Sequence, residues 1–250
     1  METFLTNLPV AHRGLHDDVA PENSLSAFRA AIQLGYAVET DVRLSKDGEL
    51  IIYHDDVLSR LTQSNRKVVD CTKDELKKLL LEGKEPIPTL QEFLDCIGGA
   101  VPILLEIKNV PEWNTQDFIA KVAAAFDGYE GEYAVQSFVP AYVKAYKKLR
   151  PAIFCGILAT AGSTKADYGN SPIWRLKAYA VKHMSFNRSL KPDFISYCFS
   201  HYPNRATEKY KGIKLAWTVR SPEDEEYARK YADNIIFEGY LAEKPKKEKS

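Results

Sequence analysis

Eight short apolar runs recur along the chain, and helical patterns separate them. They span 8–11, 37–42, 101–107, 133–136, 152–158, 193–198, 213–219 and 234–237. Strands that alternate with helices are typical of parallel sheets, because each parallel connection needs a crossover. In a chain of 250 residues, 45% of them apolar, this pattern predicts an α/β protein built as a single (β/α)8 TIM barrel. The alternative is an open doubly wound sheet, although no G-x-G-x-x-G follows the first run.

Helix start and stop signals lie between the runs. Either Asn23 or Ser24 can cap a helix that Gly35 ends. Other N-terminal signals are the capping-box spacings Thr72/Glu75 and Thr89/Glu92 and the dipeptide Ser221-Pro222. These signals favour helices at the places where a barrel needs them.

A ninth apolar run, 50–53, does not fit the alternation. It follows the second run after a polar stretch that contains Asp47-Gly48, a pair typical of two-residue hairpin loops. We therefore expect a short β-hairpin extension after strand 2. With that loop, His54 would lie opposite Asp41 and on the same face, and Glu39 would share that face.

Reactive side chains gather where the predicted strands end. Four clusters do so: His12-Arg13-Gly14, Glu39-Thr40-Asp41, His54-Asp55 and Glu106-Ile107-Lys108. Active sites of barrels are built at the C-terminal ends of the strands, so the four clusters are expected to converge on one mouth. Each cluster alone has a plain structural interpretation, as surface ion pairs or packed histidines. Together they favour a site, because inward polar groups are costly unless they are paired or ligated.

Three carboxylates are predicted to meet at this mouth, Glu39 and Asp41 from one strand and Glu106 from another. Like charges held together raise one another's pKa, so the cluster is unfavourable by itself. A hard cation relieves the repulsion, and ligands that are all oxygen suit Mg²⁺ or Ca²⁺ rather than zinc. The sequence therefore predicts a site for one divalent cation.

Two cations and two histidines are expected beside the carboxylates. Arg13 and Lys108 suit an anion with several oxygens, above all a phosphate. His12 and His54 can gain or lose a proton near neutral pH, so they can act as an acid and base pair. A metal ion, a cationic clamp and two proton carriers are together typical of phosphoryl transfer.

These residues, in this order, resemble the glycerophosphodiester phosphodiesterase family. The motifs that carry the resemblance are His12-Arg13-Gly14, Pro21-Glu22-Asn23-Ser24, Glu39-Thr40-Asp41-Val42, Lys46-Asp47-Gly48, His54-Asp55, Pro88-Thr89-Leu90, Glu106-Ile107-Lys108, Ser137-Phe138 and Trp217-Thr218-Val219. The match is dense in the first half of the chain and looser in the second. It implies a barrel of the phospholipase-C-like phosphodiesterase type, one divalent cation, and hydrolysis of glycerophosphodiesters to an alcohol and sn-glycerol 3-phosphate.

By position, the resemblance assigns roles to three sets of residues. They are His12 and His54 for catalysis, Glu39, Asp41 and Glu106 for the metal ion, and Arg13, Lys108 and Trp217 for the substrate. Trp217 can instead be a packing residue, and Asn23, which matches a motif beside the site, can instead cap a helix. Relatives that cleave phosphoinositides suggest a cyclic phosphate intermediate, with direct attack by water as the alternative.

Two stretches depart from the family pattern. Arg220 follows Trp-Thr-Val where asparagine is common, and Phe237-Glu238 stands where the family usually has threonine and aspartate. Glu238 can replace that aspartate, but Phe237 supplies no hydroxyl. We expect these departures to affect the choice of head group more than catalysis.

Two other functions remain open. A lysophospholipase D type of phosphodiesterase on the same site would need an apolar channel or an interfacial amphipathic surface, and the sequence shows no clear one. A barrel that binds phosphodiesters without cleaving them would not need two histidines, whereas this chain has His12 and His54 with all three carboxylates.

Net charge, apolar runs and cysteine spacing indicate which partners and which cellular compartment to expect. Lysine plus arginine total 34, as do aspartate plus glutamate, so we expect no nucleic-acid partner. The chain shows no signal-peptide pattern and no apolar run of membrane-spanning length, so we expect no stable membrane insertion. Four scattered cysteines without a CxxC pair suggest reduced thiols in the cytoplasm. Residues 1–242 are expected to form the barrel domain and 243–250 a charged flexible tail.

Overall fold

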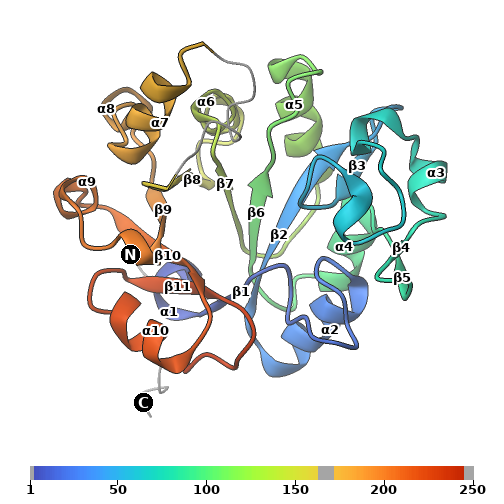
Figure 1. Ribbon diagram of the computed structural model, residues 1–250, viewed down its shortest axis with the longest axis horizontal. Helices are drawn as coiled ribbons and strands as arrows, with labels where there is room; N and C mark the ends of the chain where they lie inside the picture. Colours follow the sequence, from blue (N-terminus) through green and yellow to red (C-terminus); the bar gives the residue numbers. More distant parts are fainter. Residues whose placement is uncertain (1–2, 163–171, 245–250) are drawn as a thin grey trace.

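Eight parallel strands close into a ring with helices around it (Figure 1). The computed structural model describes residues 3–162 and 172–244. The ring strands are β1 (Val10–Ala11), β2 (Ala37–Leu44), β6 (Ile103–Ile107), β7 (Tyr133–Ser137), β8 (Phe154–Ala159), β9 (Phe194–Cys198), β10 (Ile213–Val219) and β11 (Asn234–Phe237). Because β1 pairs with both β2 and β11, the ring is closed. The predicted TIM barrel is confirmed, and the open doubly wound sheet is excluded.

The helices in the described residues are α1 (Phe4–Asn7), α2 (Leu25–Leu34), α3 (Lys73–Leu76), α4 (Leu90–Ile97), α5 (Thr115–Ala125), α6 (Pro140–Leu149), α7 (Trp174–Lys182), α8 (Asn187–Leu190), α9 (Arg205–Lys209) and α10 (Pro222–Ala228). Four of them, α2, α3, α4 and α10, begin at the predicted signals. Ser24 caps α2 by accepting from the Ala27 N–H, and Gly35 ends that helix with φ 61°. Both predicted capping boxes form, and Ser221 caps α10.

Side-chain alternation fills the ring in two layers. The lower layer is apolar and packs against Phe4 and Leu5 of α1; its strand residues are Val10, Ala37, Leu104, Ala134, Phe194, Leu215 and Ile236. The residue two positions further along each strand points to the same side, one layer higher. Those residues are His12, Glu39, Glu106, Gln136, Ser196, Trp217 and Glu238. The apolar side chains that fill the barrel therefore lie one layer, or two residues, below a mostly polar layer. We call this upper layer, at the C-terminal end of the strands, the polar layer.

A small lobe lies outside the ring, at the right of Figure 1. Its strand β3 (Leu50–Ile52) pairs antiparallel with the end of β2. The lobe also holds α3 and the short elements η1 (Leu58–Arg60), η2 (Val68–Asp70), β4 (Leu80–Leu81) and β5 (Glu85–Pro86). It has an apolar core of its own, formed by Ile51, Tyr53, Leu58, Leu61, Val68, Cys71, Leu76, Leu81 and Ile87. The predicted hairpin extension is thus the first part of a larger insertion.

The register of this hairpin differs by one residue from the predicted register. Asp41 lies opposite Tyr53, whose N–H donates to the Asp41 carbonyl at 3.1 Å, and not opposite His54. The connection is a three-residue loop rather than Asp47-Gly48 alone, because Gly48, with φ 78°, donates to the Ser45 carbonyl at 3.0 Å. His54 therefore comes after the strand and reaches the barrel mouth from a loop.

The end of the described chain returns to the barrel. The Lys244 ammonium lies 4.3 Å from the centroid of the Tyr36 ring. Residues 245–250, most of the predicted tail, lie outside the described residues. Within 3–162 and 172–244, no helix has both the length and the apolar character needed to cross a membrane.

Candidate active site

The three carboxylates predicted to bind a metal ion meet in the polar layer. Glu39 and Asp41 lie on β2, and Glu106 lies opposite Asp41 on the neighbouring strand β6. One oxygen from each carboxylate lies within 4.8 Å of the other two, and all three side chains are buried. Pairing of two parallel strands is therefore what assembles the cluster.

Burial and mutual repulsion dominate the electrostatics of this cluster. Burial, together with the charges of Asp41 and Glu106, raises the pKa of Glu39 well above its usual value. Burial also acts to raise the pKa of Asp41, but Lys108 and other positive groups outweigh it and lower that pKa. Lys108 Nζ lies 2.7 Å from Glu106 Oε1 and 3.5 Å from Asp41 Oδ1. The positive side chains therefore stabilise the charged form of Asp41 but leave the charged form of Glu39 unfavourable.

The donor set fits a divalent cation. Asp41 Oδ1 is buried and has no hydrogen-bond partner among the described residues. Three carboxylates offer only oxygen ligands, which suit Mg²⁺ or Ca²⁺. A cation among them would also offset the repulsion that raises the Glu39 pKa.

A buried amide fixes the position of Asp41. Asn23 Nδ2 donates to Asp41 Oδ2 at 2.9 Å, while Asn23 Oδ1 accepts from Thr40 Oγ1 at 2.7 Å. The backbone of Asn23 is left-handed, with φ 57°, a region that asparagine enters more readily than most residues. Because Ser24 is the helix cap, the interpretation of Asn23 as a cap is wrong.

His12 lies directly after β1, where its N–H donates to the Phe237 carbonyl at 2.9 Å. Its Nδ1 is hydrogen-bonded to Glu238 Oε2, and Arg220 Nε donates to Glu238 Oε1 at 2.7 Å. Burial lowers the pKa of His12, and the hydrogen bond to Glu238 opposes that shift. Two positions that depart from the family pattern thus form one chain of contacts behind His12.

His54 is held in a similar way from its loop. Its Nδ1 lies 2.7 Å from Asp55 Oδ1, and Arg60 Nε donates to Asp55 Oδ2 at 2.6 Å. Arg60 also donates to both oxygens of Glu22, at 2.6 and 2.7 Å, which ties the lobe to the loop after β1. Arg43 Nη2 donates to the His54 carbonyl at 2.8 Å. Each histidine therefore has a carboxylate at Nδ1 and an arginine behind that carboxylate.

Arg13 reaches the carboxylates from the end of β1. Its N–H donates to Glu39 Oε2 at 3.0 Å, and its Nη1 donates to Glu22 Oε1 at 2.7 Å. Its Nε lies 3.5 Å from Asp41 Oδ2 but has no hydrogen-bond partner among the described residues. This buried donor therefore faces the Asp41 carboxylate and adds positive charge beside the cluster.

A cavity of about 250 Å³ brings all the predicted site residues except Asp41 to one surface. Those that line it are His12, Arg13, Glu39, His54, Glu106, Lys108 and Trp217. Trp217 Nε1 donates to the Ser196 carbonyl at 3.0 Å, and its ring meets Phe138 edge-on, with 5.7 Å between centroids. Trp217 thus serves both as a packing residue and as a wall of the cavity. A second cavity of about 580 Å³ shares Glu106, Lys108, Phe138 and Trp217 with the first.

Most of the chain matches the sequence model of the "Glycerophosphoryl diester phosphodiesterase family", which covers residues 12–237. The chain belongs to this family. A curated relative, the "Glycerophosphodiester phosphodiesterase" of Caldanaerobacter subterraneus subsp. tengcongensis, is 31% identical over 245 residues, 93% of this chain and 94% of the relative. The family resemblance seen in the motifs is therefore confirmed, and the chain is a phosphoric diester hydrolase.

Solved structures of the same family share the fold. An Oleispira antarctica phosphodiesterase, solved in complex with the product sn-glycerol-3-phosphate, has a TM-score of 0.74 and 25% identity, and the match covers 92% of this chain and 93% of that one. The glycerophosphodiester phosphodiesterase of Thermotoga maritima has a TM-score of 0.69 and 26% identity, over 92% of this chain and 94% of that one.

Two residues beside the family's motifs were not predicted. Gln136 is buried next to Glu106 and accepts a hydrogen bond from Ser196 Oγ at 2.6 Å. Strand alternation alone signals Gln136, since it lies two positions after the inward Ala134. Arg60, by contrast, has no signal in the sequence, because the lobe that positions it has no regular pattern.

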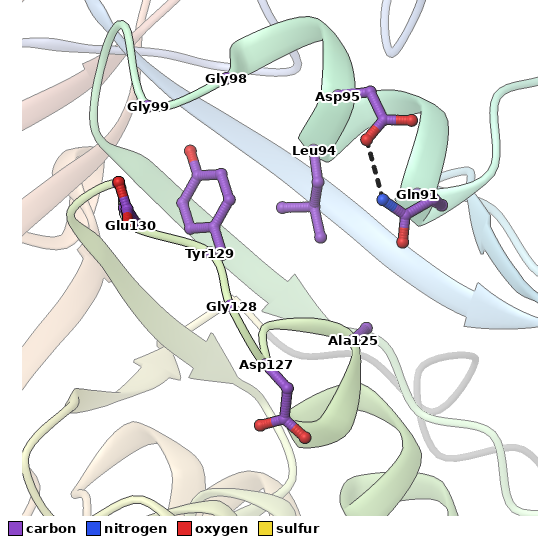
Figure 2. A pocket seen from close by; sticks show the side chains of 11 residues that line it. Gln91, Leu94, Asp95, Gly98, Gly99, Ala125, Asp127, Gly128, Tyr129 and Glu130 are labelled. Atoms are coloured by element: carbon purple, nitrogen blue, oxygen red, sulfur yellow. Dashed lines mark hydrogen bonds between the residues drawn. The ribbon is translucent and has the colours of Figure 1, made fainter.

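Another cleft, of about 480 Å³, lies at the opposite end of the barrel (Figure 2). It is formed by the loops that precede β6 and β7, so it faces away from the carboxylates. Two of its acidic side chains have partners: Asp95 accepts from Gln91 at 2.8 Å, and Asp127 pairs with Arg150. No histidine is among its lining residues, which distinguishes it from the mouth.

We expect Glu39→Gln to abolish cation binding at the carboxylate cluster. In chelator-stripped wild-type protein, Ca²⁺ or Mg²⁺ at 100 times its Kd should raise the unfolding temperature by about 5–10 °C, because the ion binds only the folded state. The variant should show no such rise. Without any cation it should unfold at a higher temperature than wild type, because one repelling charge is gone.

The matched control is Glu130→Gln, which removes the same charge at the cleft of Figure 2. It should keep the full response to the cation. A response of Glu39→Gln equal to that of wild type would show that the ion binds elsewhere.

Proposed function

We propose that the protein hydrolyses glycerophosphodiesters to an alcohol and sn-glycerol 3-phosphate in a reaction that requires one divalent cation, Mg²⁺ or Ca²⁺. The observation that carries the proposal is the single cavity in which both histidines meet the carboxylate cluster and the two cations. The complex of the Oleispira antarctica relative with sn-glycerol-3-phosphate supports this substrate class.

His12 and His54 are the acid and base pair. A carboxylate can only accept a hydrogen bond, so Glu238 and Asp55 keep a proton on Nδ1 of the two rings. That leaves Nε2 of each ring to exchange a proton with the substrate. One histidine removes a proton from the attacking hydroxyl, and the other protonates the leaving oxygen.

Glu39, Asp41 and Glu106 hold the cation, which when bound supplies positive charge to stabilise the phosphoryl oxygens. The guanidinium of Arg13 and the Lys108 ammonium, which line the cavity, bind the phosphate oxygens. Trp217 positions the glycerol or the leaving group, because its ring forms a wall shared by both cavities.

The attacking hydroxyl can belong to the substrate or to water. Attack by a neighbouring substrate hydroxyl gives a cyclic phosphate that water then opens, and direct attack by water gives none. Both routes need His12 and His54 as proton acceptor and donor, so variants of these histidines do not distinguish the routes. A search for a cyclic phosphate in quenched reactions does.

The four cysteines are unpaired, and Cys71 and Cys155 are buried. We therefore propose that the enzyme is located in the cytoplasm, where thiols stay reduced. We also propose that its partners are small phosphodiesters and not nucleic acids, since the chain has no net charge.

The test is release of sn-glycerol 3-phosphate from glycerophosphocholine and glycerophosphoethanolamine by the chelator-stripped protein with Mg²⁺, Ca²⁺ or Mn²⁺ restored. Turnover should need the cation, and His12→Ala or His54→Ala should lower it by about 10²- to 10⁴-fold, the usual contribution of an acid or base. Binding of the diesters without turnover under every cation, by folded protein, would favour the non-catalytic barrel instead.

We expect Arg60→Ala to slow turnover by about 10- to 100-fold while the KM changes little, as is common when a residue behind a catalytic group is lost. Arg60 acts through Asp55 and Glu22 and does not line the cavity. Arg60→Lys should recover part of the rate, because it keeps the charge.

Arg66→Ala is the control, since Arg66 is an exposed arginine of the same lobe that pairs with Glu75. Its turnover should match that of wild type. An equal loss in both variants would mean that the lobe contributes stability alone, and loss of affinity without loss of rate would place Arg60 in substrate binding.

A further inference from the structure

Helix α7 exposes an apolar stripe. None of its residues is fully buried. Ile173, Leu176 and Tyr179 are 53%, 64% and 59% exposed, and their spacing of three residues puts them on one side of the helix. Large apolar side chains scattered singly need no explanation, but three along one face of a helix form a surface that can bind something.

The segment around this stripe is strongly basic. Residues 172–192 hold no acidic residue, whereas the whole chain has equal numbers of both signs, 34 and 34. Their cations, all exposed, are Arg175, Lys177, Lys182, Arg188 and Lys191. At 3.6 residues per turn, Arg175 and Lys182 lie along one border of the apolar stripe and Lys177 lies along the other. An apolar face between basic borders is the pattern of a helix that lies flat on an anionic membrane.

The opposite side of α7 faces the active site. Val181 lines the cavity of about 580 Å³, together with Phe138, Trp217 and Lys108. That cavity continues into the smaller one that holds both histidines, since the two share Lys108, Phe138 and Trp217. The helix that carries the stripe is therefore also part of the wall of the cavity that adjoins His12 and His54.

We propose that α7 docks on a membrane that contains anionic lipid, with its apolar stripe in the membrane interface. The basic residues beside the stripe indicate which partner binds there. An anionic membrane complements an apolar stripe that has positive charge on both sides. Tyr179, within the stripe, is of an aromatic type that favours the membrane interface. The nine-residue helix, about 13 Å long, suits a position within the interface rather than across the bilayer. The docking does not depend on the proposed function.

The experiment measures binding of the full-length protein to vesicles of phosphatidylcholine with and without phosphatidylserine. Wild type should cosediment with the anionic vesicles, at least about tenfold more than with neutral ones. Leu176→Ser with Tyr179→Ser should remove that binding by at least about tenfold. Leu149→Ser is the control, because Leu149 is 47% exposed at the end of α6.

Turnover separates docking from the chemistry. The double variant should hydrolyse soluble glycerophosphocholine at the wild-type rate, which also verifies its fold. Equal binding of wild type and double variant would overturn the proposal. So would a dimer that dissociates in the double variant, because the stripe would then be covered by a second copy. Vesicle binding without turnover of any diester would retain docking and refute the proposed function.

Discussion

Three carboxylates buried within 4.8 Å of one another are the constraint on which the rest of the site depends. Each of them would be stable in water, and their burial together must be compensated. Lys108 and Arg13 supply fixed positive charge, and Asn23 satisfies one oxygen of Asp41. That compensation is incomplete, as the raised pKa of Glu39 indicates, and a divalent cation would complete it. The unfavourable arrangement is therefore best understood as part of the function.

The barrel carries this arrangement because its strands separate two tasks. The lower layer of apolar side chains, with α1 beneath it, stabilises the ring, and the layer two residues further along each strand holds the reactive groups. Both histidines then receive the same kind of support, a carboxylate at Nδ1 and an arginine beyond it, although one comes from β1 and the other from a lobe outside the ring.

Much of the fold and the site was predictable because strand periodicity and capping are local. The runs at 213–219 and 234–237 coincide with β10 and β11, and Glu39, Asp41 and Glu106 meet as alternation requires. The hairpin register was missed because Gly48 adds a residue to the loop, which no local pattern shows. The sequence also showed no interfacial surface, since the stripe on α7 is recognised only once the barrel determines which side chains remain exposed.

The central claim is that these carboxylates bind one divalent cation beside the cavity that both histidines line. Crystals soaked in Mn²⁺ and measured at its absorption edge test it directly, because the anomalous signal locates the ion without any assumption about its ligands. The account predicts one strong peak bounded by Glu39, Asp41 and Glu106 in wild type and none there in Glu39→Gln. A peak elsewhere, or no peak at this cluster in active crystals, would contradict it.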